Sequence, residues 1–148
     1  MKVECRIDPS LQEPCATLNI REMTPAIAEI IRLLESTDSV TGALAAERDG
    51  KTYFIEQDSL ELIRTEGREI ACYDRAKHRY TLARPLYELE SILGSSFIRV
   101  SKSTIVNMRR ISHVAAAFNG TMELTMKCGV QDYISRSFRK AFKERLGL

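Results

Sequence analysis

The sequence predicts an α+β fold, in which a small N-terminal segment of strands and one helix precedes a β-dominated part with short helices. Three observations predict it. The 148 residues are 44% hydrophobic and 28% charged, a composition that supports one packed core of ordinary size. Apolar residues at helical spacing occur in three short stretches only. Short runs of strand-forming residues, separated by turn residues, fill most of the rest.

The N-terminal region predicts two short strands and a helix. Residues 3–7 alternate apolar and polar side chains, and residues 16–20 form a second short strand-like run. Thr24 and Pro25 are typical of a helix start, as the N-cap and the first helical residue. An apolar stripe at helical spacing follows, made of Ile27, Ile30, Ile31 and Leu34. The helix is expected to end within residues 36–42.

From residue 43 onward the chain predicts mostly strands. The dipeptides Asp-Gly at 49–50 and Asn-Gly at 119–120 are typical of tight hairpin turns. Pro85 opens a short helix and Ser135 begins a final one, whereas the polar stretch 101–107 is expected to be irregular. Strands are expected over residues 43–48, 52–56, 60–64, 70–74, 80–83, 97–100, 111–118, 121–126 and 130–134.

Residues that could form a catalytic or metal site are sparse. His78 and His113 have no Cys or carboxylate at metal-ligand spacing, and the chain has no Gly-rich phosphate loop or nucleophile motif. The four cysteines lack a C-x-x-C pair, which favours free thiols over zinc or disulfides. The sequence therefore predicts a protein that is not an enzyme, with no catalytic residue, metal ligand or cofactor.

Hydropathy favours a cytoplasmic location. The longest apolar run, 114–118, is far shorter than the roughly 20 residues that span a bilayer. The first residues carry charges too early for a secretory signal.

Charge is distributed unevenly along the chain. Residues up to Glu66 include seven Lys and Arg and thirteen Asp and Glu. From Gly67 onward there are fifteen Lys and Arg and seven Asp and Glu. The basic residues of the second half gather at three expected loops or element ends: Arg68, Arg75, Lys77 and Arg79; Arg99, Lys102, Arg109 and Arg110; and Arg136, Arg139, Lys140, Lys143 and Arg145. Three basic loops that converge on one edge suit duplex DNA, although ordinary surface charge explains the composition equally well.

The stretch Phe97–Asn107, FIRVSKSTIVN, followed by Ile111, resembles the signature of LytTR-type DNA-binding domains. LYELE at 86–90 is similar to the family's short helix, and YISR at 133–136 to its entry into the last helix. The resemblance covers about residues 58–148. It implies a compact fold of short strands that reads DNA through loops in two successive major grooves, with phosphate contacts at the intervening minor groove. Residues 1–57 are then expected to form a strand-strand-helix-hairpin extension for dimerisation or regulation.

By position, the resemblance assigns DNA contacts to three loops: Arg68 and Glu69 in the first; Ser101, Lys102 and Ser103 in the second; Arg136, Ser137, Arg139 and Lys140 in the third. Ser103 is implied as a phosphate contact, and Arg139 and Lys140 are placed near the DNA backbone. Many relatives carry His at Ser101 and a second Arg at Ser137, where Arg136 or Arg139 would substitute. Asn107 is expected to cap a turn in preference to contacting a base.

The leading hypothesis is a sequence-specific transcriptional regulator that binds double-stranded DNA through the major groove. A homodimer is expected, because one small module offers few base contacts. Only about 57 residues precede the matching part, so the chain resembles a stand-alone member without a receiver domain. Such members tend to accompany a small membrane protein, which would be a regulatory partner.

Two other classes of protein compete with this hypothesis. The chain could be a protein-interaction or ligand-sensing module with the same fold and weak or no specific DNA binding. RNA binding is less favoured, because the five Tyr and five Phe fall mostly on apolar faces instead of being free to stack on bases.

Overall fold

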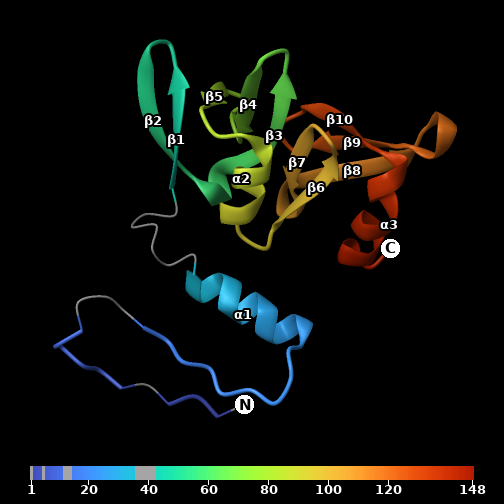
Figure 1. Ribbon diagram of the computed structural model, residues 1–148. Helices are drawn as coiled ribbons and strands as arrows, with labels where there is room; N and C mark the ends of the chain where they lie inside the picture. Colours follow the sequence, from blue (N-terminus) through green and yellow to red (C-terminus); the bar gives the residue numbers. More distant parts are fainter. Residues whose placement is uncertain (1, 5, 12–14, 36–42) are drawn as a thin grey trace. The chain divides into compact units, whose positions relative to one another are not determined.

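The computed structural model describes residues 2–4, 6–11, 15–35 and 43–148, and divides the chain into two compact units, residues 1–37 and 38–148 (Figure 1). In the first unit, helix α1 (Pro25–Glu35) begins where the sequence predicts it. The backbone N–H of Ile27 donates to Thr24 Oγ1 at 3.3 Å, which confirms Thr24 as the N-cap. The expected helix end at 36–42 lies outside the described residues.

The two strands predicted near the N-terminus were wrong. The described residues of 3–7 and 16–20 have no strand structure and lie open to solvent. The side chains of Val3 and Ile7 are 81% and 90% exposed. Alternating side chains make a strand only where a neighbouring strand takes up its backbone hydrogen bonds, and no such neighbour is present in the described part of this unit.

The second unit contains two helices and ten strands in its described residues. The helices are α2 (Leu86–Ile92) and α3 (Arg136–Leu146). The strands are β1 (Ala43–Arg48), β2 (Lys51–Glu56), β3 (Leu60–Glu66), β4 (Glu69–Asp74), β5 (Arg79–Leu82), β6 (Phe97–Ser101), β7 (Thr104–Asn107), β8 (Ile111–Ala116), β9 (Met122–Met126) and β10 (Gln131–Ile134). This content agrees with the predicted β-dominated α+β fold.

The strands form two antiparallel sheets. One has the order β2-β1-β5-β4-β3-β7-β6, and the other the order β10-β9-β8. Asp49 and Gly50 join β1 to β2 with positive φ angles of 51° and 72°, as the predicted two-residue turn requires. The loop between β8 and β9 is longer than predicted, because Ala116 pairs with Met122 and five residues lie between them.

The prediction that residues 101–107 are irregular was also wrong. After a turn at 102–103, residues 104–107 form β7, which is buried along its length between β3 and β6. Its polar side chains are satisfied inside the protein. Thr104 Oγ1 donates to Asp132 Oδ2 at 3.1 Å, and Asn107 Nδ2 donates to the Leu60 carbonyl at 3.0 Å. Long-range partners of this kind let a polar segment occupy the middle of a sheet.

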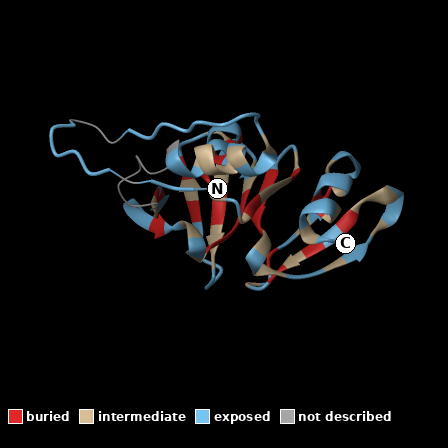
Figure 2. Cartoon of the chain, turned by 90° about the horizontal axis from the view of Figure 1, so that it is seen from below, coloured by how far each residue is buried: buried red, intermediate tan, exposed pale blue. Residues whose placement is uncertain are grey.

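Two hydrophobic cores lie on opposite faces of the larger sheet. Figure 2 shows the buried residues along its strands. Ile105 and Val106 are neighbours in β7 and belong to different cores, because successive strand residues point to opposite faces. The first core includes Leu89 of α2, and the second includes Leu124 of β9 and Phe142 of α3. One face of the larger sheet therefore packs against α2, and the other packs against the smaller sheet and α3.

The β1–β2 hairpin belongs to the same sheet as the remainder of the second unit. Glu47 of β1 pairs with Thr81 of β5, and Leu44 and Ile55 join the first core. A boundary between residues 57 and 58 thus falls inside a compact unit, which begins at residue 38. An isolated two-stranded hairpin is marginal in water, so the hairpin gains its stability from this attachment. The role of residues 1–57 stays a prediction.

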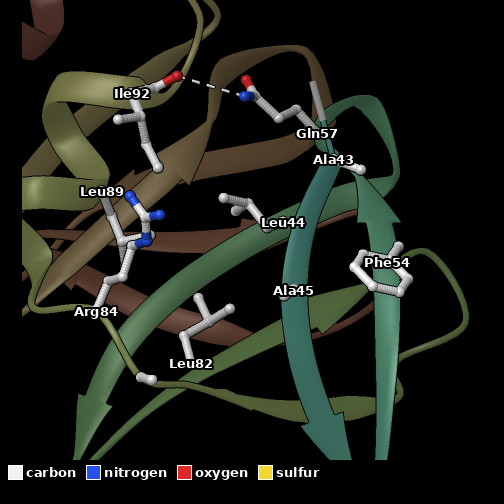
Figure 3. A pocket seen from close by; sticks show the side chains of 10 residues that line it. Ala43, Leu44, Ala45, Phe54, Gln57, Leu82, Arg84, Leu89 and Ile92 are labelled. Carbon is white, nitrogen blue, oxygen red and sulfur yellow. Dashed lines mark hydrogen bonds between the residues drawn. The ribbon is translucent and has the colours of Figure 1, made fainter. Parts of the chain in front are cut away.

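A pocket of about 340 Å3 lies where this hairpin meets β5 and α2 (Figure 3). Leu44, Leu82 and Leu89 line it, and the Gln57 side-chain amide donates to the Ile92 carbonyl at 3.4 Å across one end. In the described part of the chain, no helix is both long and apolar enough to cross a membrane.

Candidate nucleic-acid interface

The three loops to which the sequence assigns DNA contacts lie side by side in the second unit. The backbone N–H of Thr65, beside the β3–β4 turn, donates to the Ser103 carbonyl in the β6–β7 turn at 2.9 Å. The backbone N–H of Ser135, at the start of α3, donates to the Val100 carbonyl of β6 at 2.9 Å. These bonds link the loops into one continuous row, which we call the loop row: the β3–β4 turn, the β6–β7 turn and the first turn of α3.

The β3–β4 turn presents Arg68 to solvent. Gly67 has a positive φ of 62°, which a side chain would strain, and the tight turn places Arg68 at its tip. Arg68 is exposed and has no ion pair or side-chain hydrogen bond among the described residues. Glu69 differs, because its carboxylate accepts a hydrogen bond from Arg79 Nη2 at 2.9 Å. Of the two predicted contacts in this loop, only Arg68 is uncommitted.

A polar network beneath the loop row ties four strands together. Glu66 Oε2 accepts from Arg64 Nε at 2.6 Å and from the Tyr73 hydroxyl at 2.7 Å. Arg64 Nη1 also donates to Asp132 Oδ2 at 3.2 Å, and Thr104 shares that carboxylate. The network joins β3 to β4, β7 and β10, so the loops rest on a fixed base.

The charge of Glu66 is stabilised by this network. Burial alone would raise the pKa of its carboxyl, but hydrogen bonds from Tyr73, Arg64 and Arg79 outweigh burial and lower the pKa to about 2. Glu66 is therefore ionised at neutral pH and holds both arginines.

The β6–β7 turn is fixed from within and leaves Lys102 free. Arg99 donates from Nε to the Ser101 carbonyl at 2.8 Å and from Nη2 to the Lys102 carbonyl. Its Nη1 donates to Glu90 Oε2 of α2 at 2.9 Å. Ser101 Oγ accepts from the Ser103 backbone N–H at 3.2 Å, so this hydroxyl serves the turn itself. Lys102 is exposed, without a side-chain partner in the described structure.

The first turn of α3 combines free backbone donors with cations. Ser135 is the N-cap but makes no side-chain capping bond, and its hydroxyl lies 3.4 Å from that of Ser137. Arg136 and Lys140 are exposed and have no side-chain partner among the described residues. Uncapped N–H groups and nearby cations are an arrangement that binds phosphate. Arg139 is partly committed, since its Nη1 donates to the Gly120 carbonyl at 3.3 Å.

Several basic residues predicted near these loops lie elsewhere or are paired. Arg75 and Lys77 follow β4 at the end opposite to Arg68, and Arg75 donates to the Asp58 carbonyl at 3.0 Å. Arg110 is paired at 2.8 Å with Glu61, which is completely buried. Arg145 donates to the Ser95 carbonyl. Arg75, Arg110 and Arg145 therefore bind within the fold.

Asn107 caps a turn, as the sequence predicts. It is only 2% exposed, and its Oδ1 accepts the Arg109 backbone N–H at 3.1 Å. The clamp formed by Arg99 and Glu90 was not predicted, because nine residues and a change from helix to strand separate the pair. The only sequence signal was an arginine three residues before Lys102, which is not specific.

The described residues show no built metal or thiol site. No group of three or more His, Cys, Asp and Glu in this part of the chain could hold a metal ion. The three described cysteines, Cys15, Cys72 and Cys128, are free thiols, and only Cys72 is buried. Burial raises the pKa of the Cys72 thiol to about 12, so this thiol stays protonated at neutral pH.

Comparison with known proteins identifies the second unit. The family model of the LytTr DNA-binding domain matches residues 50–147. The transcriptional regulatory protein LytR of Staphylococcus aureus (strain N315) is 33% identical over 107 residues, 72% of this chain and 43% of that protein. An HTH-type transcriptional regulator of S. aureus (strain MRSA252) is 27% identical over 148 residues, 100% of this chain and 99% of that protein.

A solved structure shows the same fold. It is the LytTr DNA-binding domain of a methyl-accepting/DNA response regulator from Bacillus cereus, with a TM-score of 0.67 and 21% identity. The match covers 72% of this chain and 97% of that domain. The chain spans less than half the length of the LytR proteins that it matches. Since the family model covers more than half of the chain, the chain belongs to the LytTr DNA-binding domain family.

Proposed function

We propose that this protein is a transcriptional regulator that binds specific sequences of duplex DNA through the loop row. The observation that supports the proposal is that some cations of the loop row are bonded within the protein and others are not. Four exposed cations on three adjacent loops have no partner within the described structure: Arg68, Lys102, Arg136 and Lys140. The neighbouring arginines, by contrast, form hydrogen bonds within the protein. A set of uncommitted cations on fixed loops is what a polyanion with a defined shape requires.

The loops suggest a division of labour. Arg68 and Lys102 project from turn tips, where they can reach the acceptors of guanine in the major groove. Phosphates would be contacted by Ser103, Ser137, Lys140 and the N–H groups at the start of α3, where the N-cap makes no side-chain bond. Arg136 is the candidate for base contact in the third loop, because Arg139 is held by Gly120.

We further propose that the protein acts in the cytoplasm as a homodimer on a repeated site. One domain offers few base contacts, and two-fold repetition doubles them. The first unit, with the apolar stripe of α1, would supply the dimer contacts or the binding site for a regulatory membrane protein. Light scattering with and without DNA tests the dimer, and a strict monomer in both conditions would contradict it.

The test of DNA recognition is selection of binding sites from randomised duplexes, followed by titration of variants. Lys102→Ala and Arg68→Ala are each expected to cost about 1–3 kcal/mol of discrimination between the selected site and a scrambled one. Lys51→Ala is the matched control, because it removes the same charge from the exposed edge strand β2. If no motif emerges, or all duplexes bind equally, the protein is better described as a protein-interaction module.

A further inference from the structure

We infer that the loop joining β8 to β9 is a fourth DNA contact, in which Phe118 inserts into the minor groove adjoining the major groove reached by α3. This inference rests on the proposed function, because it needs the loop row to lie on duplex DNA. It adds an apolar contact to a surface for which the family resemblance supplies only polar and charged ones.

Phe118 is presented to solvent by an ordered loop. Its side chain is 91% exposed, while the loop around it is closed by two hydrogen bonds. The Ala117 N–H donates to the Thr121 carbonyl at 3.0 Å, and Thr121 Oγ1 donates to the Phe118 carbonyl at 2.9 Å. Asn119 and Gly120 follow with positive φ angles of 60° and 75°. A single exposed apolar residue is common on proteins, so the argument depends on what surrounds the ring.

The loop is attached directly to the basic first turns of α3. Arg139 Nη1 donates to the Gly120 carbonyl at 3.3 Å. A Cβ at Gly120 would meet Arg136 Cδ and Cγ at 3.2 and 3.3 Å, so the Arg136 stem lies against this glycine. The loop that carries Phe118 therefore contacts Arg136 and Arg139 through Gly120. In Figure 1 this loop is the orange segment at the end of β8 and β9.

The attachment extends the loop row by one member. Hydrogen bonds link the β3–β4 turn to the β6–β7 turn, β6 to Ser135, and α3 to Gly120. Major and minor grooves alternate along one side of a duplex. If the loop row occupies major grooves, the next segment outward from α3 meets a minor groove.

The chemistry of this loop fits a minor groove better than a protein surface. Proteins that bind the minor groove insert apolar wedges such as Phe between base steps while cations hold the adjacent phosphates. Phe118 supplies the wedge, and Arg139, whose guanidinium lies at the Gly120 carbonyl, supplies a cation. A protein partner would instead be favoured by a broad apolar patch, whereas the described contacts of this loop at Gly120 are with Arg136 and Arg139.

The experiment compares wild type with Phe118→Ala on two versions of the selected duplex, one ending at the recognised bases and one extended by a helical turn on each side. We expect the variant to lose about tenfold in affinity for the extended duplex, the loss typical of one aromatic contact to a base, and to bind the short duplex like wild type. Phe54→Ala is the matched control, since Phe54 is 77% exposed on the far edge strand β2. Phe118→Leu should retain part of the affinity, because leucine also serves as a wedge.

A direct readout is 2-aminopurine placed at successive steps of each flank. Wild type should raise the fluorescence at one step by unstacking it, and Phe118→Ala should abolish the increase. If Phe118→Ala binds the extended duplex like wild type with no fluorescence change, while Lys102→Ala still loses discrimination, the inference is overturned and the proposed function stands. If Lys102→Ala also has no effect, the proposed function itself fails. A change in oligomeric state with Phe118→Ala and unchanged DNA affinity would identify the loop as a protein contact and overturn the inference.

Discussion

The arginine side chains of the second unit divide into two kinds: those that hold loops and those that remain free. Arg99 is the clearest of the first kind, since one guanidinium contacts two carbonyls of the β6–β7 turn and the carboxylate of Glu90. Its side chain is 19% exposed, so DNA would reach Lys102 before Arg99. Arg99 would thus contribute to DNA recognition by holding the turn that carries Lys102.

Replacing Arg99 by Lys tests this positioning role. Lysine keeps the charge but lacks the planar fork that reaches two carbonyls and a carboxylate together. We expect Arg99→Lys to lower the affinity for the selected site by about 1–2 kcal/mol, in line with the loss of charge-assisted hydrogen bonds, and to leave nonspecific binding near wild type. Arg109→Lys is the control, because Arg109 is exposed and lacks a side-chain partner in the described structure. Equal losses for specific and nonspecific DNA would argue for a direct phosphate contact.

The lowered pKa of Glu66 implies that the free energy of unfolding depends on pH. Its folded-state pKa of about 2 lies below the ordinary value of 4.5, so ionised Glu66 stabilises the fold above that value. This contribution is lost as the pH falls from about 4.5 toward 2. Urea unfolding should show that Glu66→Gln is less stable than wild type at pH 7 and that the difference shrinks across this window. A difference that stays constant down to pH 2 would contradict the role of the Glu66 charge.

Single residues also show where sequence reasoning reached its limit. The resemblance located Arg68 and Lys102 because turn tips keep their place in the chain whatever packs beneath them. It did not predict the hydrogen bond from Arg139 to Gly120 across 19 residues. A bond of that range depends on the loop length between β8 and β9, which the Asn-Gly pattern underestimated.

At the scale of elements, local signals succeeded where turn chemistry is self-contained. Thr24-Pro25 and Asp49-Gly50 were placed correctly, because each needs only its neighbours. Residues 3–7 and 104–107 were assigned wrongly for the opposite reason. The first has the right alternation but no partner strand among the described residues. The second is polar and forms a central strand through contacts with Asp132 and Leu60.

We predict that packing of Leu44 in the first core stabilises the attachment of the β1–β2 hairpin. Leu44 is 7% exposed and lies in the first core beside the pocket of Figure 3. Leu44→Ala should lower the free energy of unfolding by about 2–4 kcal/mol, the range for a buried leucine that leaves a cavity. Amide hydrogen exchange should quicken most in β1 and β2. Leu148→Ala, at a side chain that is 68% exposed, is the control and should change stability little.

Over the whole molecule, charge is the feature that sequence and structure share most directly. The excess of basic residues after Gly67 is visible in the composition, but composition does not show which cations are available. Internal bonds engage several of these side chains, and four of those left without a partner in the described structure lie on the loop row. The strength of the field that reaches DNA is therefore set by pairing in the fold as much as by net charge.

Salt dependence measures how many of those cations DNA engages. Each phosphate contact adds about 0.9 to the negative slope of log affinity against log salt concentration, so Lys140→Ala should reduce the slope by about 1 for the selected site and for scrambled DNA alike. Lys102→Ala should instead weaken the selected site more than scrambled DNA, because a base contact carries the sequence information. Lys127→Ala removes the same charge from the β9–β10 turn, at the end of β10 opposite to α3, and should leave the slope unchanged. If Lys127→Ala lowers the slope as much as Lys140→Ala does, DNA senses the overall charge of the protein and the loop row is not its binding surface.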